Sequence, residues 1–162
     1  GENMRNEMKL EFIASPANEG MARVAVASFM TSLNPTLEEV EDVKTAVSEA
    51  VSNCIIHGYG MPEEGRLDSG LAEGNSRIYI TCTTKGKELQ VEIRDYGVGI
   101  ADIKKAMEPL YTSKPELERS GMGFAFMEAF MDQLFVESTP GKGTCVRMIK
   151  NLADTKMQSV WE

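Results

Sequence analysis

The chain has 162 residues, a length that suits one domain with a buried core, and its hydrophobic and charged fractions of 42% and 26% are ordinary for a globular protein. The formal net charge of -8 argues against direct nucleic-acid binding, because phosphate backbones are bound by clustered lysine and arginine. No run of about 18 apolar residues predicts a membrane span, and no signal peptide precedes the first predicted strand, so a cytoplasmic domain without a membrane partner is expected.

One domain is predicted over residues 4–152, followed by a weakly patterned tail at 153–162. Residues 1–3 are interpreted as a remnant of expression. Three cysteines lie far apart on apolar faces, and a metal site would need paired spacing, so structural thiols in a reducing compartment are expected. These cysteines are Cys54, Cys82 and Cys145.

The first elements are a strand and a helix. Alternating residues predict a strand at 9–14 with Leu10, Phe12 and Ala14 on its inner side. Ser15-Pro16 then begins a helix that extends to about residue 33, where Asn34-Pro35 ends it. Arg23 is the only positive charge on this otherwise alanine- and valine-rich helix.

A second, longer helix is the segment around which the candidate site is organised. Thr36 and Glu39 form a capping box at its start, and His57-Gly58 is predicted to end it with a C-cap glycine. Its apolar residues recur at three- and four-residue steps, which predicts a buried stripe. The stripe consists of Leu37, Val40, Val43, Val47, Ala50, Val51 and Cys54.

Glycine and acidic residues at 61–76 predict a long acidic loop. Beyond it the pattern alternates between hairpins and helices, which predicts an α+β fold. We expect a two-layer sandwich in which a mixed, mostly antiparallel sheet has helices on one face. The predicted elements are strands at 77–84 and 88–95, a short helix at 103–107, a polar stretch at 111–120, a helix at 123–133, and strands at 135–138 and 144–149.

Glu49 and Asn53 stand one turn apart on the second helix, so their side chains share a face. A carboxylate and a carboxamide beside a buried stripe suit a site that holds a hydrated metal ion and moves a proton. The alternative is that both are solvated polar residues on the outer side of an amphipathic helix.

Asp95-Tyr96-Gly97-Val98-Gly99 follows a predicted strand. Asp95 can accept a hydrogen bond from an exocyclic amine such as that of adenine. Gly97 and Gly99 allow the backbone to turn sharply and to approach a flat ligand. The alternative is a glycine-rich turn in which the aspartate caps a helix.

Gly121-Met122-Gly123 stands directly before a predicted helix, where free backbone N–H groups favour a phosphate. Arg119 is placed to meet a terminal phosphate, and Thr112-Ser113-Lys114 is predicted to form part of a lid over the nucleotide. The alternative is an ordinary flexible hinge.

The common nucleotide-binding motifs fail in this chain. Asp102 replaces the third glycine of a Rossmann fingerprint that would begin at Gly97, and Phe126 replaces it in one that would begin at Gly121. Counting back from Thr144, Glu137 stands where a P-loop needs its earlier glycine. Neither motif is therefore predicted.

The order of these segments resembles a known family of ATP-binding domains. Glu49-x-x-x-Asn53, Asp95-x-Gly97-x-Gly99, Gly121-x-Gly123 and Gly143-Thr144 come in the order seen in gyrase, Hsp90, histidine kinases and MutL. Residues 18–27, 48–59 and 110–124 resemble, more closely, the anti-sigma factors that control sporulation sigma factor F. The resemblance covers 4–152, and the acidic loop is longer here than in that family.

The resemblance implies ATP and Mg²⁺ as cofactors and gives each residue a role. Asn53 would ligate Mg²⁺, and Glu49 would be the general base that takes a proton from a serine hydroxyl of a protein substrate. Asp95 would bind adenine, with Thr144 supporting it through a water. Arg119 would contact the γ-phosphate. The remaining residues would shape the pocket and its lid: Gly97, Gly99, Thr112, Ser113, Lys114, Gly121, Met122 and Gly123.

The same resemblance implies a serine/threonine protein kinase that binds a sporulation sigma factor and phosphorylates an anti-anti-sigma protein. It also implies a homodimer. Arg23 is a candidate partner contact, with a snorkelling surface arginine as the alternative. His57 is expected to cap its helix rather than to act in catalysis.

Two other hypotheses remain. One is a non-catalytic, ATP-gated module that only sequesters the sigma factor; the presence of Glu49 argues against it, because a pure binding module needs no base. The other is an ATPase domain detached from a histidine kinase, against which the missing phosphoacceptor helix counts.

Overall fold

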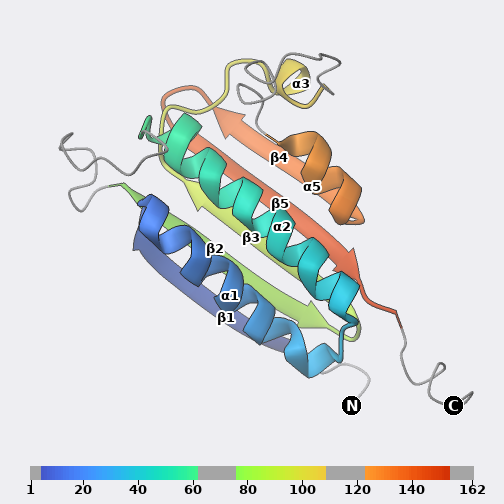
Figure 1. Cartoon of the computed structure of the whole chain (residues 1–162). Helices are drawn as coiled ribbons and strands as arrows, with labels where there is room; N and C mark the ends of the chain where they lie inside the picture. The colour runs from blue at the N-terminus through green and yellow to red at the C-terminus, as the bar shows by residue number, and fades with distance from the viewer. Residues whose placement is uncertain (1–4, 62–75, 109–122, 154–162) are drawn as a thin grey trace, which may run out of the picture.

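The computed structural model describes residues 5–61, 76–108 and 123–153. Over these residues a sheet carries helices on one of its faces (Figure 1). The strands are β1 (Arg5–Ile13), β2 (Arg77–Lys85), β3 (Glu88–Asp95), β4 (Gln133–Thr139) and β5 (Gly143–Asn151). The helices are η1 (Pro16–Asn18), α1 (Glu19–Met30), η2 (Thr31–Leu33), α2 (Leu37–Asn53), η3 (Cys54–Gly58), α3 (Ile103–Ala106) and α5 (Phe124–Phe130).

The sheet has the strand order β1-β2-β3-β5-β4. All four strand pairs are antiparallel, so the described sheet is wholly antiparallel, whereas a mixed, mostly antiparallel sheet was predicted. The helix α2 comes between β1 and β2 in the chain, yet these strands still pair as antiparallel neighbours. The predicted α+β sandwich with helices on one face is confirmed.

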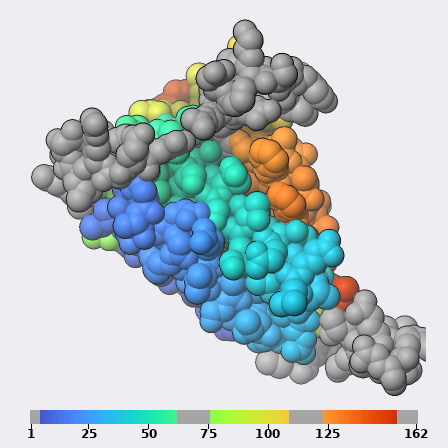
Figure 2. All heavy atoms as spheres, viewed as in Figure 1, coloured from blue at the N-terminus to red at the C-terminus, as the bar shows by residue number. Residues whose placement is uncertain are grey.

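Alternation along the strands separates the two faces of the sheet. Ile78, Ile80 and Cys82 of β2 and Leu89, Val91 and Ile93 of β3 are buried beneath the helices, as the period of two predicts. Figure 2 shows α1, α2 and α5 side by side over this face, with α2 in the middle. The position of α2 over the centre of the sheet explains why its stripe supplies so much of the core.

The start of α2 follows the predicted capping box closely. The Thr36 hydroxyl accepts from the Glu39 amide at 3.1 Å, and the Glu39 carboxylate accepts from the Thr36 amide at 2.9 Å. One residue of the predicted stripe is misplaced: Leu37 is 86% exposed, because the first residue of the helix lies outside its contact with the core. The stripe becomes fully buried only from Val43 onward.

The end of α2 differs from the prediction. The helix continues into the π-helical turn η3, and Gly58 does not have the positive φ of a C-cap glycine; Gly60 has it instead, at 70°. His57 lies inside η3. π-helical turns are rare and tend to occur at functional sites. The end of α2 is therefore a candidate position for a functional site.

The first helix keeps its predicted bounds, whereas the end of α5 differs from the prediction. The first helix has 3-10 turns at both ends, and Asn34 ends it in the left-handed region with a φ of 53°. The helix α5 ends at Phe130 rather than near 133, because Met131 is extended and β4 begins at Gln133. Within the described ranges no helix is long and apolar enough to cross a membrane.

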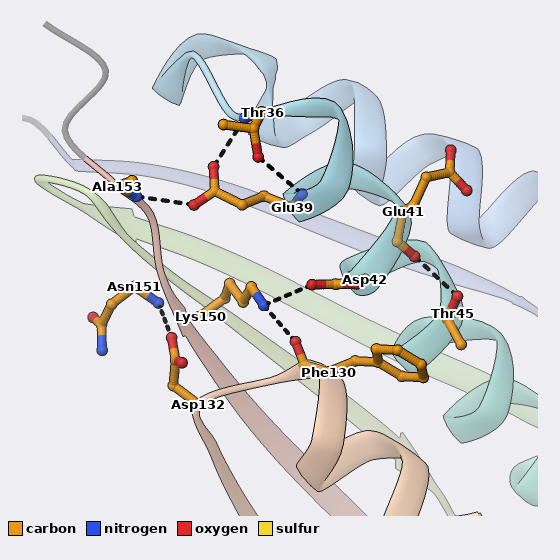
Figure 3. Close-up of polar contacts among 10 residues, drawn as sticks. All are labelled: Thr36, Glu39, Glu41, Asp42, Thr45, Phe130, Asp132, Lys150, Asn151 and Ala153. Atoms are coloured by element: carbon orange, nitrogen blue, oxygen red, sulfur yellow. Dashed lines mark hydrogen bonds and ion pairs between the residues drawn. The ribbon is translucent and has the colours of Figure 1, made fainter. Parts of the chain in front are cut away.

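A set of polar contacts joins the start of α2 to the ends of β5 and α5 (Figure 3). The Lys150 ammonium donates to the Asp42 carboxylate at 3.2 Å and to the Phe130 carbonyl. The second oxygen of Glu39 accepts from the Ala153 amide at 2.9 Å. The capping box therefore also holds the segment that follows β5.

We expect Glu39→Ala to lower the free energy of unfolding by about 1–2 kcal/mol, because both the cap and the bond to Ala153 are lost. The matched control is Glu38→Ala, which removes the same charge from an exposed position in the same first turn. Urea unfolding of both variants measures the difference. Equal losses would mean that only the helix-dipole contribution of these charges matters.

Candidate functional site

The candidate site lies at the end of the sheet where α2 and β3 both end and where β4 turns into β5 (Figure 1). The structure brings seven of the predicted residues to this region or to the helices that border it: Glu49, Asn53, Asp95, Gly97, Gly99, Gly123 and Thr144. Six others lie outside the described residues: Thr112, Ser113, Lys114, Arg119, Gly121 and Met122. The acidic loop, the polar stretch at 111–120 and the C-terminal tail from 154 also lie outside them.

Glu49 is a half-buried carboxylate on the last full turn of α2. Burial raises its pKa above the usual 4.5, and the charge of Glu19 on α1 raises this pKa further. Both causes act on the ionised form, which burial and a like charge disfavour. A carboxylate held in this way is a stronger base than an exposed one, which is the property required of a proton acceptor.

Gly123 fits closely against the Glu49 side chain. It is the N-cap residue of α5 and has a positive φ of 65°. A Cβ atom added there would lie less than 3.0 Å from the Glu49 Oε2 atom, a separation that real Cβ atoms essentially never show. The start of α5 therefore lies directly against this carboxylate, and a methyl group at position 123 would push the end of the Glu49 side chain aside.

Asn53 is the last residue of α2 and is partly buried. It supplies an amide oxygen one turn beyond the carboxylate of Glu49, and hard oxygen donors are the kind that Mg²⁺ prefers. In the described part of the chain no group of three or more His, Cys, Asp or Glu residues could hold a metal ion.

Asp95 ends β3 and is almost fully buried, with 3% of its surface exposed. Its Oδ1 atom accepts from the Gly97 amide at 2.9 Å. Burial raises the Asp95 pKa, and hydrogen bonding by Gly97, Cys54 and Thr144 opposes the rise. A buried acceptor held from several sides can recognise a ligand that presents an N–H group.

The loop after Asp95 rests on the π-helical turn η3. The Val98 amide donates to the Gly58 carbonyl at 2.9 Å. A Cβ on Gly97 would lie within 3.0 Å of the Gly58 backbone, and a Cβ on Gly58 would lie 2.9 Å from the Asp95 Cγ atom. The glycines at this corner are therefore required because backbone segments contact one another, whereas the sequence suggested contact with a ligand.

Two further residues of the site were missed from the sequence. The Ser138 Oγ atom of β4 lies 2.7 Å from the Thr144 Oγ1 atom and accepts from the Ile100 amide at 2.7 Å. The Tyr59 hydroxyl accepts from the Tyr96 amide at 2.8 Å and donates to a carbonyl of β2. Both side chains hold the loop after Asp95 in place. Their contacts join residues that are far apart in the sequence, so no local pattern predicts them.

Arg23 lies on α1 and forms an ion pair with Glu19 at 3.2 Å, with 42% of its side chain exposed. Glu19 is also the residue whose charge raises the Glu49 pKa. Arg23 is thus connected to the Glu49 end of the site through one shared acidic neighbour.

Comparisons with known proteins identify the family of the chain. The family described as the histidine kinase-like ATPase domain matches residues 12–150. The anti-sigma F factor of Oceanobacillus iheyensis is 53% identical over 94% of this chain and 97% of its own length. That of Bacillus subtilis is 48% identical over the same shares of the two chains. The chain belongs to the anti-sigma F factor family, within the histidine kinase-like ATPases.

Solved structures extend the likeness of this family member to more distant proteins. A histidine kinase domain from Erythrobacter litoralis aligns with a TM-score of 0.52 at 17% identity, over 86% of this chain and 63% of its own. The catalytic domain of the histidine kinase ThkA aligns with a TM-score of 0.51 at 14% identity, over 90% and 96%. At such low identity these two structures support the fold alone.

For this family member we expect Gly123→Ala to reduce at least tenfold any transfer reaction that depends on Glu49, because the new methyl group would displace the Glu49 carboxylate. The control is Gly141→Ala, which has the same kind of positive φ, 80°, but meets no atom within 4 Å. In each variant, placing an alanine at a positive φ lowers the free energy of unfolding by about 1 kcal/mol. Equal transfer rates in the two variants would show that the contact with Glu49 does not matter.

Proposed function

We propose that the chain is a cytoplasmic anti-sigma factor that inhibits a sporulation sigma factor and also acts as an ATP-dependent serine protein kinase on an anti-anti-sigma protein. The names of the two relatives, at 48–53% identity over nearly the whole chain, support the anti-sigma part. The match to an ATPase domain supports ATP as the cofactor. The kinase part rests on the site itself.

The adenine end of the proposed site is formed by Asp95. Its buried carboxylate would accept a hydrogen bond from the adenine 6-amino group, and burial makes such a bond selective because an unmet acceptor there is costly. Thr144, which is held by Ser138, would support this contact through a water. Because Gly97 and Gly99 have no side chains, the loop would leave room for the adenine base.

The phosphate end is formed by Asn53 and Glu49. Asn53 would hold Mg²⁺, which when bound neutralises charge on the phosphates. Glu49 would accept the proton of the attacking serine hydroxyl as that oxygen forms its bond to the γ-phosphorus, while the bond from the γ-phosphorus to the bridging oxygen breaks and ADP leaves. Gly123 would keep the Glu49 carboxylate in place, and Arg119 would contact the γ-phosphate.

One observation carries the kinase proposal. The Glu49 carboxylate has a raised pKa and is enclosed by the start of α5 at a position one turn before Asn53. Holding a charged group half-buried beside a like charge costs stability, and such costs are typical of groups that do chemistry. The alternative, an ATP-gated module that only sequesters the sigma factor, gives no reason for this carboxylate.

The partners are a sigma factor of the sporulation F type and an anti-anti-sigma protein, and the active form is a homodimer of the domain at 4–152. Arg23 is the proposed partner contact. It is half-exposed, and its single described ion pair to Glu19 is of the weak surface kind, so a partner carboxylate can compete for it.

Transcription directed by the sigma factor tests the anti-sigma proposal. The chain with Mg²⁺ and ATP should inhibit transcription that purified core polymerase and the sigma factor carry out. If the chain fails to inhibit this transcription in every nucleotide state, the anti-sigma proposal is wrong.

We expect Arg23→Ala to weaken sigma-factor binding by about five- to thirtyfold, the loss of one charge-assisted contact, with ATP affinity unchanged. The control is Lys44→Ala, which removes a cation from a comparable helical ion pair on α2, to Glu41 at 3.5 Å. Calorimetric titration with the sigma factor measures both variants. Equal affinities in the two variants would remove Arg23 from the interface.

A further inference from the structure

Lys150 of β5 links the end of α5 to the first half of α2 (Figure 3). Its ammonium donates to the carbonyl of Phe130, the last residue of α5, and to the Asp42 carboxylate of α2 at 3.2 Å. The Lys150 side chain is only 12% exposed, and that of Asp42 is 23% exposed. A cation with so little access to water depends on its protein partners, and removing it would take a donor from both acceptors.

The end of α5 is also held to β5 through Asp132. The Asp132 amide donates to the Ile149 carbonyl at 2.8 Å, and the Asp132 carboxylate accepts from the Asn151 amide at 2.6 Å. The last carbonyls of a helix have no partner within it, and a lysine that donates to one of them also meets the negative end of the helix dipole. Lys150 therefore holds α5 at this end and joins it to α2.

The opposite end of α5 contacts α2 a second time, because its N-cap Gly123 lies against the Glu49 carboxylate. Glu49 and Asp42 are seven residues apart on α2, and Gly123 and Phe130 are seven residues apart along α5. Seven residues are close to two helical turns, so the two points on each helix lie on one face. The two helices therefore run antiparallel, with a contact at each end of α5 (Figure 1).

The contact at Gly123 is sensitive to where α5 lies along α2. The fit leaves no room for a methyl group, and a displacement by the rise of one residue, about 1.5 Å, would change it. Ala46 lies between Asp42 and Glu49 on the same face and is fully buried, but its small side chain offers little resistance to such a movement. The link at Lys150 opposes this movement at the far end of α5.

We infer that Lys150 is a positioning residue for Glu49: it fixes α5 along α2 and so keeps Gly123 against the Glu49 carboxylate. The inference rests on the proposed function only in taking Glu49 as the general base. It gives a role at the site to a residue that acts from two helical turns away.

Lys87 provides the matched comparison. Its ammonium donates to the Leu33 carbonyl at the end of η2, so it also holds a helix end, but one that follows α1. Lys87 and Lys150 are both partly buried. Replacing either by methionine removes a cation from a helix-end carbonyl and keeps an apolar side chain. An effect that occurs only in Lys150→Met therefore comes from the link between α5 and α2.

The first test uses thermal unfolding of the whole chain without nucleotide. Gly123→Ala should lower the melting temperature more than Gly141→Ala, which shares the positive φ but meets no atom. In a Lys150→Met background α5 can move away, so this excess loss should shrink to about half, whereas independent sites would give the same loss in both backgrounds. A Lys87→Met background should leave it unchanged. If Lys150→Met does not fold, Asp42→Ala removes the α2 side of the same link.

The second test measures γ-phosphate transfer. Lys150→Met should lower the single-turnover rate at saturating ATP about tenfold and leave the dissociation constant for ATP unchanged, as expected when a catalytic group is misplaced and binding is not affected. In a Glu49→Gln background, Lys150→Met should have no further effect, because the carboxylate that it positions is absent. Lys87→Met should keep the full rate.

Two results would overturn the inference. One is an excess loss of melting temperature from Gly123→Ala that is the same with and without Lys150. The other is a loss of rate in Lys150→Met that persists in full when Glu49 is already glutamine, or that Lys87→Met reproduces. If the unaltered chain transfers no phosphate, the proposed function fails, and the melting temperatures then decide whether Lys150 holds α5 against Glu49.

Discussion

Replacing Glu49 with glutamine is expected to lower the rate of γ-phosphate transfer by about 10²–10⁴-fold, the usual contribution of a general base, with little change in ATP affinity. Glutamine keeps the size of the side chain and its contact with Gly123 but cannot accept the serine proton. Single-turnover transfer from Mg-ATP to the protein substrate measures the rate. The control is Glu41→Gln, two turns earlier on α2 and exposed.

The pH dependence gives a second readout of the same group. Because the Glu49 pKa is raised above 4.5, the transfer rate should increase with pH through that raised pKa and then level off, since only the deprotonated form accepts a proton. Glu19→Gln removes the second cause of the shift and should move this rise to lower pH. The measurement uses saturating substrate, because Glu19 also pairs with Arg23. If Glu49→Gln leaves the transfer rate unchanged, Glu49 is not the general base.

Asp95→Asn is expected to weaken ATP binding at least tenfold, because a charge-assisted hydrogen bond to the adenine amine is replaced by a neutral one. The nucleotide-free chain should at the same time keep or gain stability at neutral pH. Calorimetric titration and thermal unfolding measure the two effects. The control is Asp102→Asn, an exposed aspartate in the same loop whose capping bond to the Lys105 amide an asparagine can also make.

The sign of the stability effect follows from the direction of the pKa shift. The Asp95 pKa is higher in the folded chain than the usual 3.8, so its contribution to stability is fully present below that value and is lost as pH rises through the folded pKa. An asparagine does not undergo this loss. The melting temperature of Asp95→Asn relative to the unaltered chain should therefore increase between pH 4 and pH 7. A decrease, or unchanged ATP affinity, would contradict the assignment.

The parts of the fold that the sequence predicted are those with a repeating pattern. Alternation placed Ile78, Ile80 and Cys82 on the buried face, and the capping box placed the start of α2 at Thr36. The turn η3 has no such pattern, because a π-helical turn of five residues is too short to show a period. Its contacts are with residues distant in the sequence, such as that between Gly58 and Asp95, and the sequence does not show them.

The residues of the candidate site also fall into two groups: those that a local pattern pairs and those that only the fold brings together. Glu49 and Asn53 could be paired from the sequence because they are one turn apart on a helix. Ser138 could not, since its contact with the Ile100 amide depends on which end of the sheet the strand β4 reaches. Cys54 was correctly predicted to be a buried thiol. The Asp95 charge, which after burial helps to raise the Cys54 pKa, comes from a strand about forty residues away, and no local pattern carries that information.

The most direct test of the central claim is the transfer of γ-phosphate from Mg-ATP to a purified anti-anti-sigma protein, with mass spectrometry locating the phosphate. We predict phosphate on a single serine of that protein and none when Glu49→Gln replaces the unaltered chain. If no phosphate is transferred while ATP is bound and the sigma factor is held, the chain is an ATP-gated sequestering module and the kinase proposal is wrong.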